Sequence, residues 1–263
     1  MPATANTTND DAASEFWLYG YGSLIWKPPP HFDRRVPGWV NGYVRRFWQV
    51  CSKKHSLSLS KSPPAFESLL THTYPPPPGK VGFILRLVLH HGDDCLILIF
   101  WLILSEDHRG TPEAPGRVVT LIERSYWEKL TDHHDSAPEK VWGVAYRIVP
   151  EKVSEVKEYL DIREINGYSI HYTPFYPADG STPMQTLVYI GTPDNEQFVG
   201  PQDPQKLAQH ILNSKGPSGL NKDYLYGLDT ALNELSPDSG DYHVSDLAQR
   251  VRALEHSVNG TSS

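Results

Sequence analysis

A chain of 263 residues, 39% of them hydrophobic, is long enough to bury a substantial core, either as one domain or as two. Its formal net charge of −7 and the absence of a stripe of clustered lysines and arginines argue against a nucleic-acid-binding surface. The two cysteines, Cys51 and Cys95, match no zinc-binding or Cys-x-x-Cys spacing, and so few thiols suit a reducing compartment better than a disulfide scaffold. We therefore expect a small molecule as the partner, and no metal.

The two ends of the chain are predicted to be disordered. Residues 1–14 are small and polar, without a basic start or an apolar centre, so they are typical of a tail and not of a signal peptide. Residues 259–263 are expected to form a second tail. The longest apolar run, residues 96–104, is much shorter than the roughly 20 residues that a helix needs to cross a bilayer. We expect no membrane contact and a cytoplasmic location.

Residues 16–26 are the segment around which the chain is predicted to be organised. Residues 16–19 are aromatic and apolar enough for a buried strand, and Gly20 and Gly22 allow backbone conformations, including positive φ, that side chains forbid. Where consecutive N–H groups turn toward one point, such a loop can hold a carboxylate or a phosphate, and Ser23 can add a hydroxyl group. The alternative is an ordinary glycine turn at the end of a strand.

Three other functions of this loop are disfavoured by its context. A dinucleotide-binding fingerprint requires a third glycine that opens a helix, whereas residues 24–27 here lead into three prolines. No Gly-Lys-Ser/Thr of a phosphate-binding loop follows. A serine-hydrolase elbow requires glycine two residues after the nucleophile, where Ile25 stands after Ser23. The loop is therefore expected to bind a ligand and not to attack it.

Strands are predicted where β-branched and aromatic residues are dense, and helices where apolar residues recur every three or four positions. The predicted strands cover residues 16–19, 39–44, 45–49, 118–122, 141–148 and 186–190. The predicted helices cover residues 150–162, 204–212, 222–235 and 245–258. Because strands come early and helices late, this order favours an α+β fold with a curved sheet or half-open barrel flanked by helices. We expect a single domain over residues 15–258.

One block, residues 50–104, differs in composition from both flanks. It has a start rich in serine and lysine, four prolines at 75–78, and two almost wholly apolar runs at 83–89 and 96–104. One interpretation is a buried hairpin with its turn near Gly92-Asp93. The other is an insert around which the fold did not evolve.

A second candidate constellation follows the helix that begins at Pro150. The turn signal Asn166-Gly167 places Glu164 at or just beyond the last helical turn. A carboxylate there faces the negative end of the helix dipole, which with partial burial would raise its pKa and make it a better proton acceptor. Glu155 lies half a turn away on a straight helix. For both glutamates the alternative is an ordinary surface ion pair.

Two further clusters of polar residues are candidate functional sites. Asp107-His108-Arg109 offers a candidate acid or base, and residues 132–135, Asp-His-His-Asp, offer a candidate metal site. The second cluster lies in a polar loop without ligands at helical i, i+4 spacing, so a metal is disfavoured there.

Several of these segments also match a known family in order. They are Tyr19-Gly20-Tyr21-Gly22-Ser23-Leu24-Ile25-Trp26, Arg45-Arg46-Phe47-Trp48-Gln49, Asp107-His108-Arg109-Gly110, Pro115-Gly116-Arg117-Val118-Val119-Thr120-Leu121, Val141-Trp142-Gly143-Val144-Ala145-Tyr146, Tyr159-Leu160-Asp161-Ile162-Arg163-Glu164 and Gly216-Pro217-Ser218-Gly219. From about Trp17 to about Leu254, outside the block at 50–104, the chain resembles the ChaC family of glutathione-specific γ-glutamylcyclotransferases. The resemblance implies a small mixed β-barrel with helices, a cytosolic enzyme without a cofactor, and glutathione as substrate.

The resemblance also implies the roles of individual residues. The general base of the family falls on Glu164, and a second glutamate falls on Glu155 by its nine-residue offset. The substrate-binding loop of the family falls on Leu18, Tyr19, Gly20, Tyr21, Gly22 and Ser23. The implied reaction releases 5-oxoproline and cysteinylglycine. Alternatives are cyclotransfer on other γ-glutamyl dipeptides or amines, and an inactive glutathione-binding paralogue.

The block at 50–104 departs from this resemblance, because family members usually pass from the Phe-Trp-Gln strand to the Asp-His-Arg-Gly segment within a few residues. The block begins with valine, whose codon starts with GT as a splice donor does. We therefore hypothesise a retained intron or a gene-model error, with a true insertion as the alternative. Sequencing the mature transcript through codons 50–104 distinguishes the two.

Overall fold

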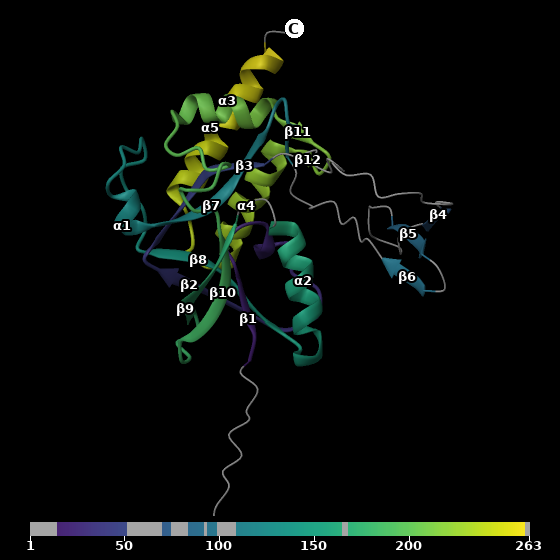
Figure 1. Cartoon of the computed structure of the whole chain (residues 1–263). Helices are drawn as coiled ribbons and strands as arrows, with labels where there is room; N and C mark the ends of the chain where they lie inside the picture. The colour runs from purple at the N-terminus through teal and green to yellow at the C-terminus, as the bar shows by residue number, and fades with distance from the viewer. Residues whose placement is uncertain are drawn as a thin grey trace, which may run out of the picture.

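A closed barrel of five strands forms the centre of the computed structural model, which describes residues 15–51, 70–74, 84–91, 94–98, 109–164 and 168–260 (Figure 1). Hydrogen-bonded neighbours follow the order β1-β10-β9-β2-β8 and return to β1. The strands are β1 (Trp17–Gly20), β2 (Phe32–Asn41), β8 (Lys140–Ile148), β9 (Ser169–Pro177) and β10 (Met184–Ile190). β1 and β10 run parallel and the other barrel pairs run antiparallel, so the barrel is mixed.

A second sheet lies against one end of this barrel. It pairs β3 (Tyr43–Cys51) with β7 (Gly116–Glu123), and α1 (Arg124–Trp127) follows directly. Gly42 joins β2 to β3 with a φ of +82°, a conformation that favours glycine. Contacts of Val119 with the segment after β1, and of Thr120 with the residue after β10, locate β7 at the end where both strands finish.

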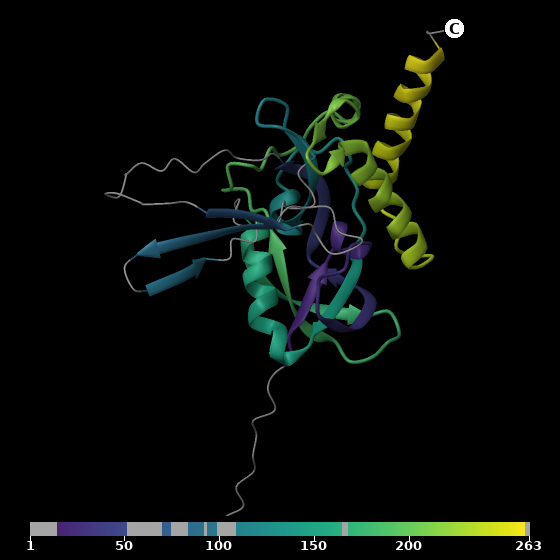
Figure 2. The ribbon, with the colours of Figure 1, turned by 90° about the vertical axis from the view of Figure 1, so that its right-hand side faces the viewer.

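Helices flank the barrel on two sides. η2 (Pro150–Lys152) leads into α2 (Val153–Glu164), which runs along the flank of the barrel (Figures 1 and 2). The helices α3 (Pro204–Asn213), α4 (Asn221–Leu235) and α5 (Tyr242–Gly260) pack on one another toward one end, with the short pair β11 (Lys215–Gly216) and β12 (Gly219–Leu220) between α3 and α4. The Asp203 side chain caps α3 by accepting the Lys206 N–H at 2.9 Å.

One continuous apolar core joins the barrel to these helices. Fully buried residues of the barrel, such as Leu18 and Phe175, belong to the same cluster as Val156 of α2, Leu225 of α4 and Val251 of α5. Burying an aliphatic or aromatic side chain contributes about 1.5–3 kcal/mol each, so this shared core fixes where the helices sit on the barrel.

The α+β barrel class expected from the sequence is confirmed, and most predicted elements lie within a few residues of the observed ones. Two points differ. The predicted strand at residues 39–44 is broken at Gly42, because the chain turns there from β2 into β3. Strand β9 was not predicted, because Pro174 and Pro177 within it argue against a strand.

Three segments of the block at residues 50–104 form a separate three-stranded sheet. It comprises β4 (Leu70–Tyr74), β5 (Ile84–His91) and β6 (Asp94–Leu98), and β5 pairs antiparallel with β4 and with β6. Residues 92–93, where the hairpin interpretation places its turn, lie outside the described residues. In addition, β3 continues two residues into the block, since Val50 pairs with Arg117 and Cys51 with Gly116.

The predicted tail at residues 1–14 lies outside the described residues, and α5 reaches Gly260, two residues into the predicted C-terminal tail. In the described part of the chain, every helix is too short or too polar to span a membrane.

Candidate functional site

The loop after β1 is a tight backbone turn. β1 ends at Gly20, and η1 (Ser23–Ile25) begins three residues later. Within this turn, the N–H groups of Trp26 and Lys27 both donate to the carbonyl oxygen of Ser23, at 3.1 and 2.8 Å. The sequence therefore forms the predicted compact loop directly at the end of a barrel strand.

The reason for the loop glycines differs from the one expected. Neither Gly20 nor Gly22 has a positive φ, so that part of the prediction is wrong. Both instead lack a Cβ because space is short. A Cβ on Gly20 would lie 2.4 Å from the Cβ of Leu24, and one on Gly22 would lie 3.0 Å from the hydroxyl of Tyr224 in α4.

Hydrogen bonds from two tyrosines hold the loop to the barrel. The Tyr21 hydroxyl donates to the carbonyl oxygen of Tyr189 near the end of β10, at 2.8 Å. The Tyr146 hydroxyl of β8 donates to the carbonyl oxygen of Leu24 at 2.7 Å. With Tyr224 packed against Gly22, the loop is held from three directions.

The first residues of the predicted substrate-binding segment have their side chains in the core. Leu18 is fully buried, and Tyr19 is 1% exposed with its hydroxyl donating to the carbonyl oxygen of Val141 at 2.8 Å. Burial raises the pKa of Tyr19 above its usual range. Any contact of these two residues with a ligand would therefore come from their backbone, and the loop proper is residues 20–23.

The helix α2 ends at Glu164, as the turn signal after it predicts. Val156 and Leu160 on this helix are buried in the barrel core, and position 164 continues their i, i+4 row. The side chain of Glu164 and residues 165–167 lie outside what the structure describes.

The path of the backbone links the end of α2 to the loop. Ser169, five residues after Glu164, starts β9 and pairs with Ile190, and its hydroxyl lies 3.2 Å from the carbonyl oxygen of Ile190. Five residues span at most about 17 Å, so the Cα of Glu164 lies within that distance of Ser169. Since β1 runs parallel to β10, Gly20 finishes at this same end of the barrel.

Glu155 has a different environment. Its side chain is 56% exposed. One carboxylate oxygen accepts a hydrogen bond from the Lys152 ammonium at 2.6 Å, and the other lies 3.1 Å from His31 Nε2. The hydrogen bond from Lys152 lowers the pKa of Glu155, and His31 adds to this effect. On the continuous helix α2, residues 155 and 164 are half a turn apart. The contacts of Glu155 are those of a surface ion pair.

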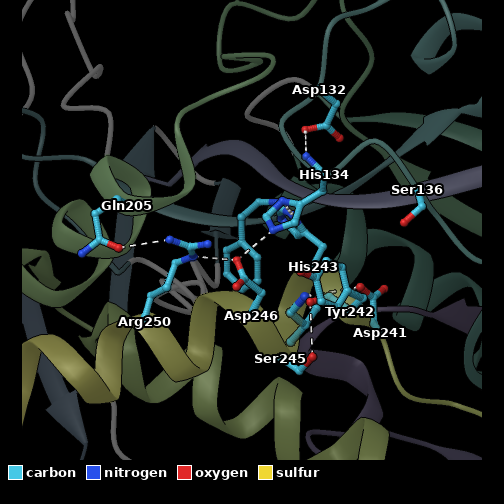
Figure 3. A network of polar contacts seen from close by, with 12 residues as sticks. Asp132, His134, Ser136, Gln205, Asp241, Tyr242, His243, Ser245, Asp246 and Arg250 are labelled. Atoms are coloured by element: carbon cyan, nitrogen blue, oxygen red, sulfur yellow. Dashed lines mark hydrogen bonds and ion pairs between the residues drawn. The ribbon is translucent and has the colours of Figure 1, made fainter.

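The candidate metal cluster belongs to a buried polar network (Figure 3). Asp132 accepts hydrogen bonds from Arg46 Nε at 2.6 Å and from Trp127 Nε1 at 2.8 Å, and His134 Nε2 lies 2.8 Å from the carboxylate of Asp246. Within the described residues, no group of three or more His, Cys, Asp or Glu side chains could hold a metal ion. Asp132 and His134 thus fasten the loop at 132–135 to β3 and α5.

Of the candidate acid or base at 107–109, Asp107 and His108 lie outside the described residues. Arg109 is buried, donates to the carbonyl oxygen of Leu220 at 3.2 Å, and lies over the ring of Tyr224. Tyr224 thus contacts both the loop glycine Gly22 and Arg109. No sequence pattern indicates this role, because Tyr224 occupies an ordinary core position of α4.

Comparison with known proteins finds a matching family model and similar sequences. A family model described as ChaC-like protein matches residues 16–69 and 98–254. A Schizosaccharomyces pombe protein named glutathione-specific gamma-glutamylcyclotransferase is 35% identical over 90% of this chain and 92% of its own length. A human protein, glutathione-specific gamma-glutamylcyclotransferase 1, is 31% identical over 96% of this chain and 86% of its own.

The fold has a counterpart among solved structures. The crystal structure of a yeast gamma-glutamyl cyclotransferase specific to glutathione superposes with a TM-score of 0.64 at 30% sequence identity. The match covers 91% of this chain and 96% of the yeast chain.

Proposed function

This chain belongs to the ChaC family, and we propose that it is a glutathione-specific γ-glutamylcyclotransferase, the activity for which its relatives are named. The observation that carries the proposal is the meeting of two segments at one end of the barrel. The glycine loop follows β1 there, and the chain from the end of α2 enters β9 beside β10. A loop suited to anions and a helix end that carries Glu164 are thereby tied to neighbouring strands.

The proposed reaction needs no second reactant. In glutathione the α-amine and the γ-carbonyl belong to one glutamyl residue, so attack of the amine nitrogen on the carbonyl carbon closes a five-membered lactam. The bond from that carbon to the cysteinyl nitrogen breaks, which releases 5-oxoproline and cysteinylglycine. Two protons leave the α-ammonium group in all, and the cysteinyl nitrogen takes up two as it becomes an ammonium group. The main task of the enzyme is to hold the amine in line with the carbonyl.

A base is required because an α-amine, with a pKa of about 8, is mostly protonated at neutral pH. We assign this role to Glu164, which can accept the proton and return it to the departing nitrogen. Its location at the C-terminal end of α2 supports the assignment, since the negative end of the helix dipole favours the protonated carboxyl group. The resemblance to the family motif implies the same role for Glu164.

The loop at residues 20–23 is assigned the γ-glutamyl part of the substrate. Backbone N–H groups of such a turn can bind the α-carboxylate, the reacting carbonyl, or both. In the second case they would also stabilise the oxyanion that develops on the carbonyl oxygen. The fixed position of the loop, held by Tyr21 and Tyr146, supports this role because preorganised donors lower the barrier most.

The second glutamate of the family motif, Glu155, stays a prediction. Its exposure and its pairing with Lys152 favour a surface role. Glu155→Gln separates the two interpretations. A catalytic role predicts a large loss of kcat, whereas a surface ion pair predicts a small change in stability and unchanged turnover.

The proposed function is tested by measuring 5-oxoproline release from glutathione and from γ-glutamyl-alanine by the purified chain. Release from glutathione and not from γ-glutamyl-alanine is expected. Comparable release from both would instead indicate a broader γ-glutamyl cyclotransferase. Protection of the chain by glutathione against thermal unfolding, without product, would indicate an inactive glutathione-binding paralogue.

A further inference from the structure

Thr120 of β7 makes a buried backbone clamp at the end of β10. Its side chain is fully buried, and its hydroxyl oxygen accepts the N–H of Gly191, the residue that follows β10, at 2.9 Å. The same hydroxyl lies 3.2 Å from the carbonyl oxygen of Gly191 and 3.3 Å from that of Leu121. One hydroxyl group therefore meets both polar backbone groups of Gly191.

Close packing makes this clamp specific to glycine. A Cβ on Gly191 would lie 2.3 Å from Oε1 of Gln49 and 3.2 Å from Oγ1 of Thr120. Gln49 is fully buried on β3 and donates to the side chain of Gln197 at 3.2 Å, so its carboxamide is held in place. Side chains of the paired strands β3 and β7 thus pack around Gly191 and hold its backbone in place.

The end of β10 contacts both parts of the proposed site, the glycine loop and the segment that follows α2. The Tyr189 carbonyl accepts the hydrogen bond of Tyr21 in the glycine loop, and Ile190 pairs with Ser169, which follows the end of α2. A Cβ on Gly22 would lie only 3.1 Å from Cγ2 of Val119, the neighbour of Thr120. Strand β7 therefore touches the loop directly and fixes the β10 end that the helix reaches.

We propose that Thr120 is a positioning residue for the cyclotransferase reaction, a role that rests on the proposed function. It acts through Gly191 and sets the distance between the glycine loop, which holds the substrate, and Glu164, which takes the proton. Thr120 does not itself touch the substrate, because its side chain is fully buried.

The test is the substitution Thr120→Val, which keeps the shape of the side chain and removes the hydroxyl group. The Gly191 N–H then loses its acceptor in a buried place, and the end of β10 is free to shift. Because the loop itself stays intact, we expect the KM for glutathione to change little. The value of kcat should fall roughly ten- to hundredfold, the scale of a misplacement of about 1 Å. Thr120→Ser, which restores the hydroxyl, should return kcat to near the wild-type value.

A matched control is available on β10. Thr186 of β10 is also fully buried, and its hydroxyl donates to the carbonyl oxygen of Thr173 at 3.1 Å, away from the β10 end. Thr186→Val removes the same group and should lower the melting temperature without lowering kcat per folded molecule. Equal kcat values in Thr120→Val, Thr186→Val and the wild type would overturn the proposal, as would equal losses in both variants.

A second pair of variants serves if Thr120→Val does not fold. Thr120→Ser and Thr120→Cys differ in one atom, and a thiol is a weak hydrogen-bond partner. The proposal predicts a several-fold lower kcat in Thr120→Cys than in Thr120→Ser at similar KM. Equal kcat values would contradict it. A wild-type chain that releases no 5-oxoproline would overturn the proposed function and this inference with it, whereas an active wild type with insensitive variants overturns the inference alone.

Discussion

The Tyr21 hydroxyl donates a hydrogen bond of 2.8 Å to the carbonyl oxygen of Tyr189, across 168 positions of the chain. This bond links the glycine loop to the end of β10, where Tyr189 is the second-last residue. One residue further, Ile190 pairs with Ser169 at the start of β9. The loop and the chain from α2 therefore share one anchor, and a change at that anchor should alter catalysis.

Removing this hydroxyl should weaken the loop without destroying the fold. In Tyr21→Phe the buried carbonyl of Tyr189 loses its donor, which should cost about 1–3 kcal/mol of unfolding free energy. Because the loop is less fixed, we expect kcat/KM for glutathione to fall roughly tenfold. Urea unfolding and initial-rate kinetics measure the two effects.

The control for this variant is Tyr226→Phe. Tyr226 donates its hydroxyl to Glu255 at 2.6 Å, on the surface between α4 and α5. That substitution should leave kcat/KM unchanged. An unchanged kcat/KM in Tyr21→Phe as well would show that the anchor has no part in the reaction.

Two kinds of glycine should respond differently to alanine. In Gly20→Ala the new methyl group would meet the Cβ of Leu24 at 2.4 Å, so the loop must move and glutathione turnover should fall at least tenfold. In Gly42→Ala nothing lies within 4 Å, but the φ of +82° is strained for alanine and should cost about 1–2 kcal/mol of stability. Thermal unfolding and 5-oxoproline release distinguish steric from conformational damage. Full activity in Gly20→Ala would contradict the packing argument.

Residues 52–104, which follow β3, should be removable without loss of the fold. Cys51 pairs with Gly116, and the backbone of Gly110 touches that of Gly116, so Cys51 and Arg109 end close together. With residues 105–108 as the linker, five Cα–Cα steps separate Cys51 from Arg109 and span up to about 17 Å, enough to join them. A chain that lacks residues 52–104 should therefore fold and release 5-oxoproline at the rate of the full chain.

The matched comparison is a chain that lacks residues 50–104. That deletion also removes the pairing of Val50 and Cys51 in β3 and the hydrogen bond of 2.8 Å from the Val50 N–H to the Gln197 carbonyl. It should be less stable than the shorter deletion. Loss of folding in the 52–104 deletion would show that the block is a necessary part of this fold.

Stability should decrease below neutral pH because of a buried histidine. Burial first, and then electrostatic interactions with Arg46, His134 and Arg45, lower the pKa of His243 well below its ordinary value of 6.5. Its Nε2 accepts the Phe47 N–H at 3.1 Å, which requires that nitrogen to be unprotonated. The unfolded chain binds a proton there below about pH 6.5 and the folded chain does not. Stability is therefore full above about pH 6.5 and falls as the pH drops below it.

The measurement is the unfolding free energy in urea between pH 7.5 and 5. One such site contributes a slope of up to about 1.4 kcal/mol per pH unit. His243→Gln keeps an acceptor and removes the titration, so its slope should be smaller by that amount. His210, whose pKa burial also lowers, contributes equally in both proteins. Identical slopes in the two proteins would contradict the assignment.

The sequence was sufficient for the local elements and insufficient for the pairings that build the site. Dense β-branched and aromatic residues located β7, β8 and β10, and the Asn166-Gly167 turn located the end of α2 at Glu164. These signals are local. Strand β9 was missed because its two prolines outweigh its alternating pattern.

The contacts that hold the candidate site join residues far apart in the chain. Thr120 and Gly191 are 71 positions apart, and Tyr21 and Tyr189 are 168 apart. The periodicity of apolar residues within a segment carries no information about such long-range contacts. The loop glycines show the same limit, because the lack of space around Gly20 and Gly22 depends on Leu24 and on Tyr224 of a distant helix.

The substitution Glu164→Gln tests whether Glu164 removes the proton from the attacking amine. We expect an intact fold by circular dichroism, unchanged protection by glutathione against thermal unfolding, and 5-oxoproline release at least about a hundredfold slower. Glu151→Gln, at an exposed position before α2, should keep the wild-type rate. Near-normal turnover in Glu164→Gln would remove this residue from the chemistry.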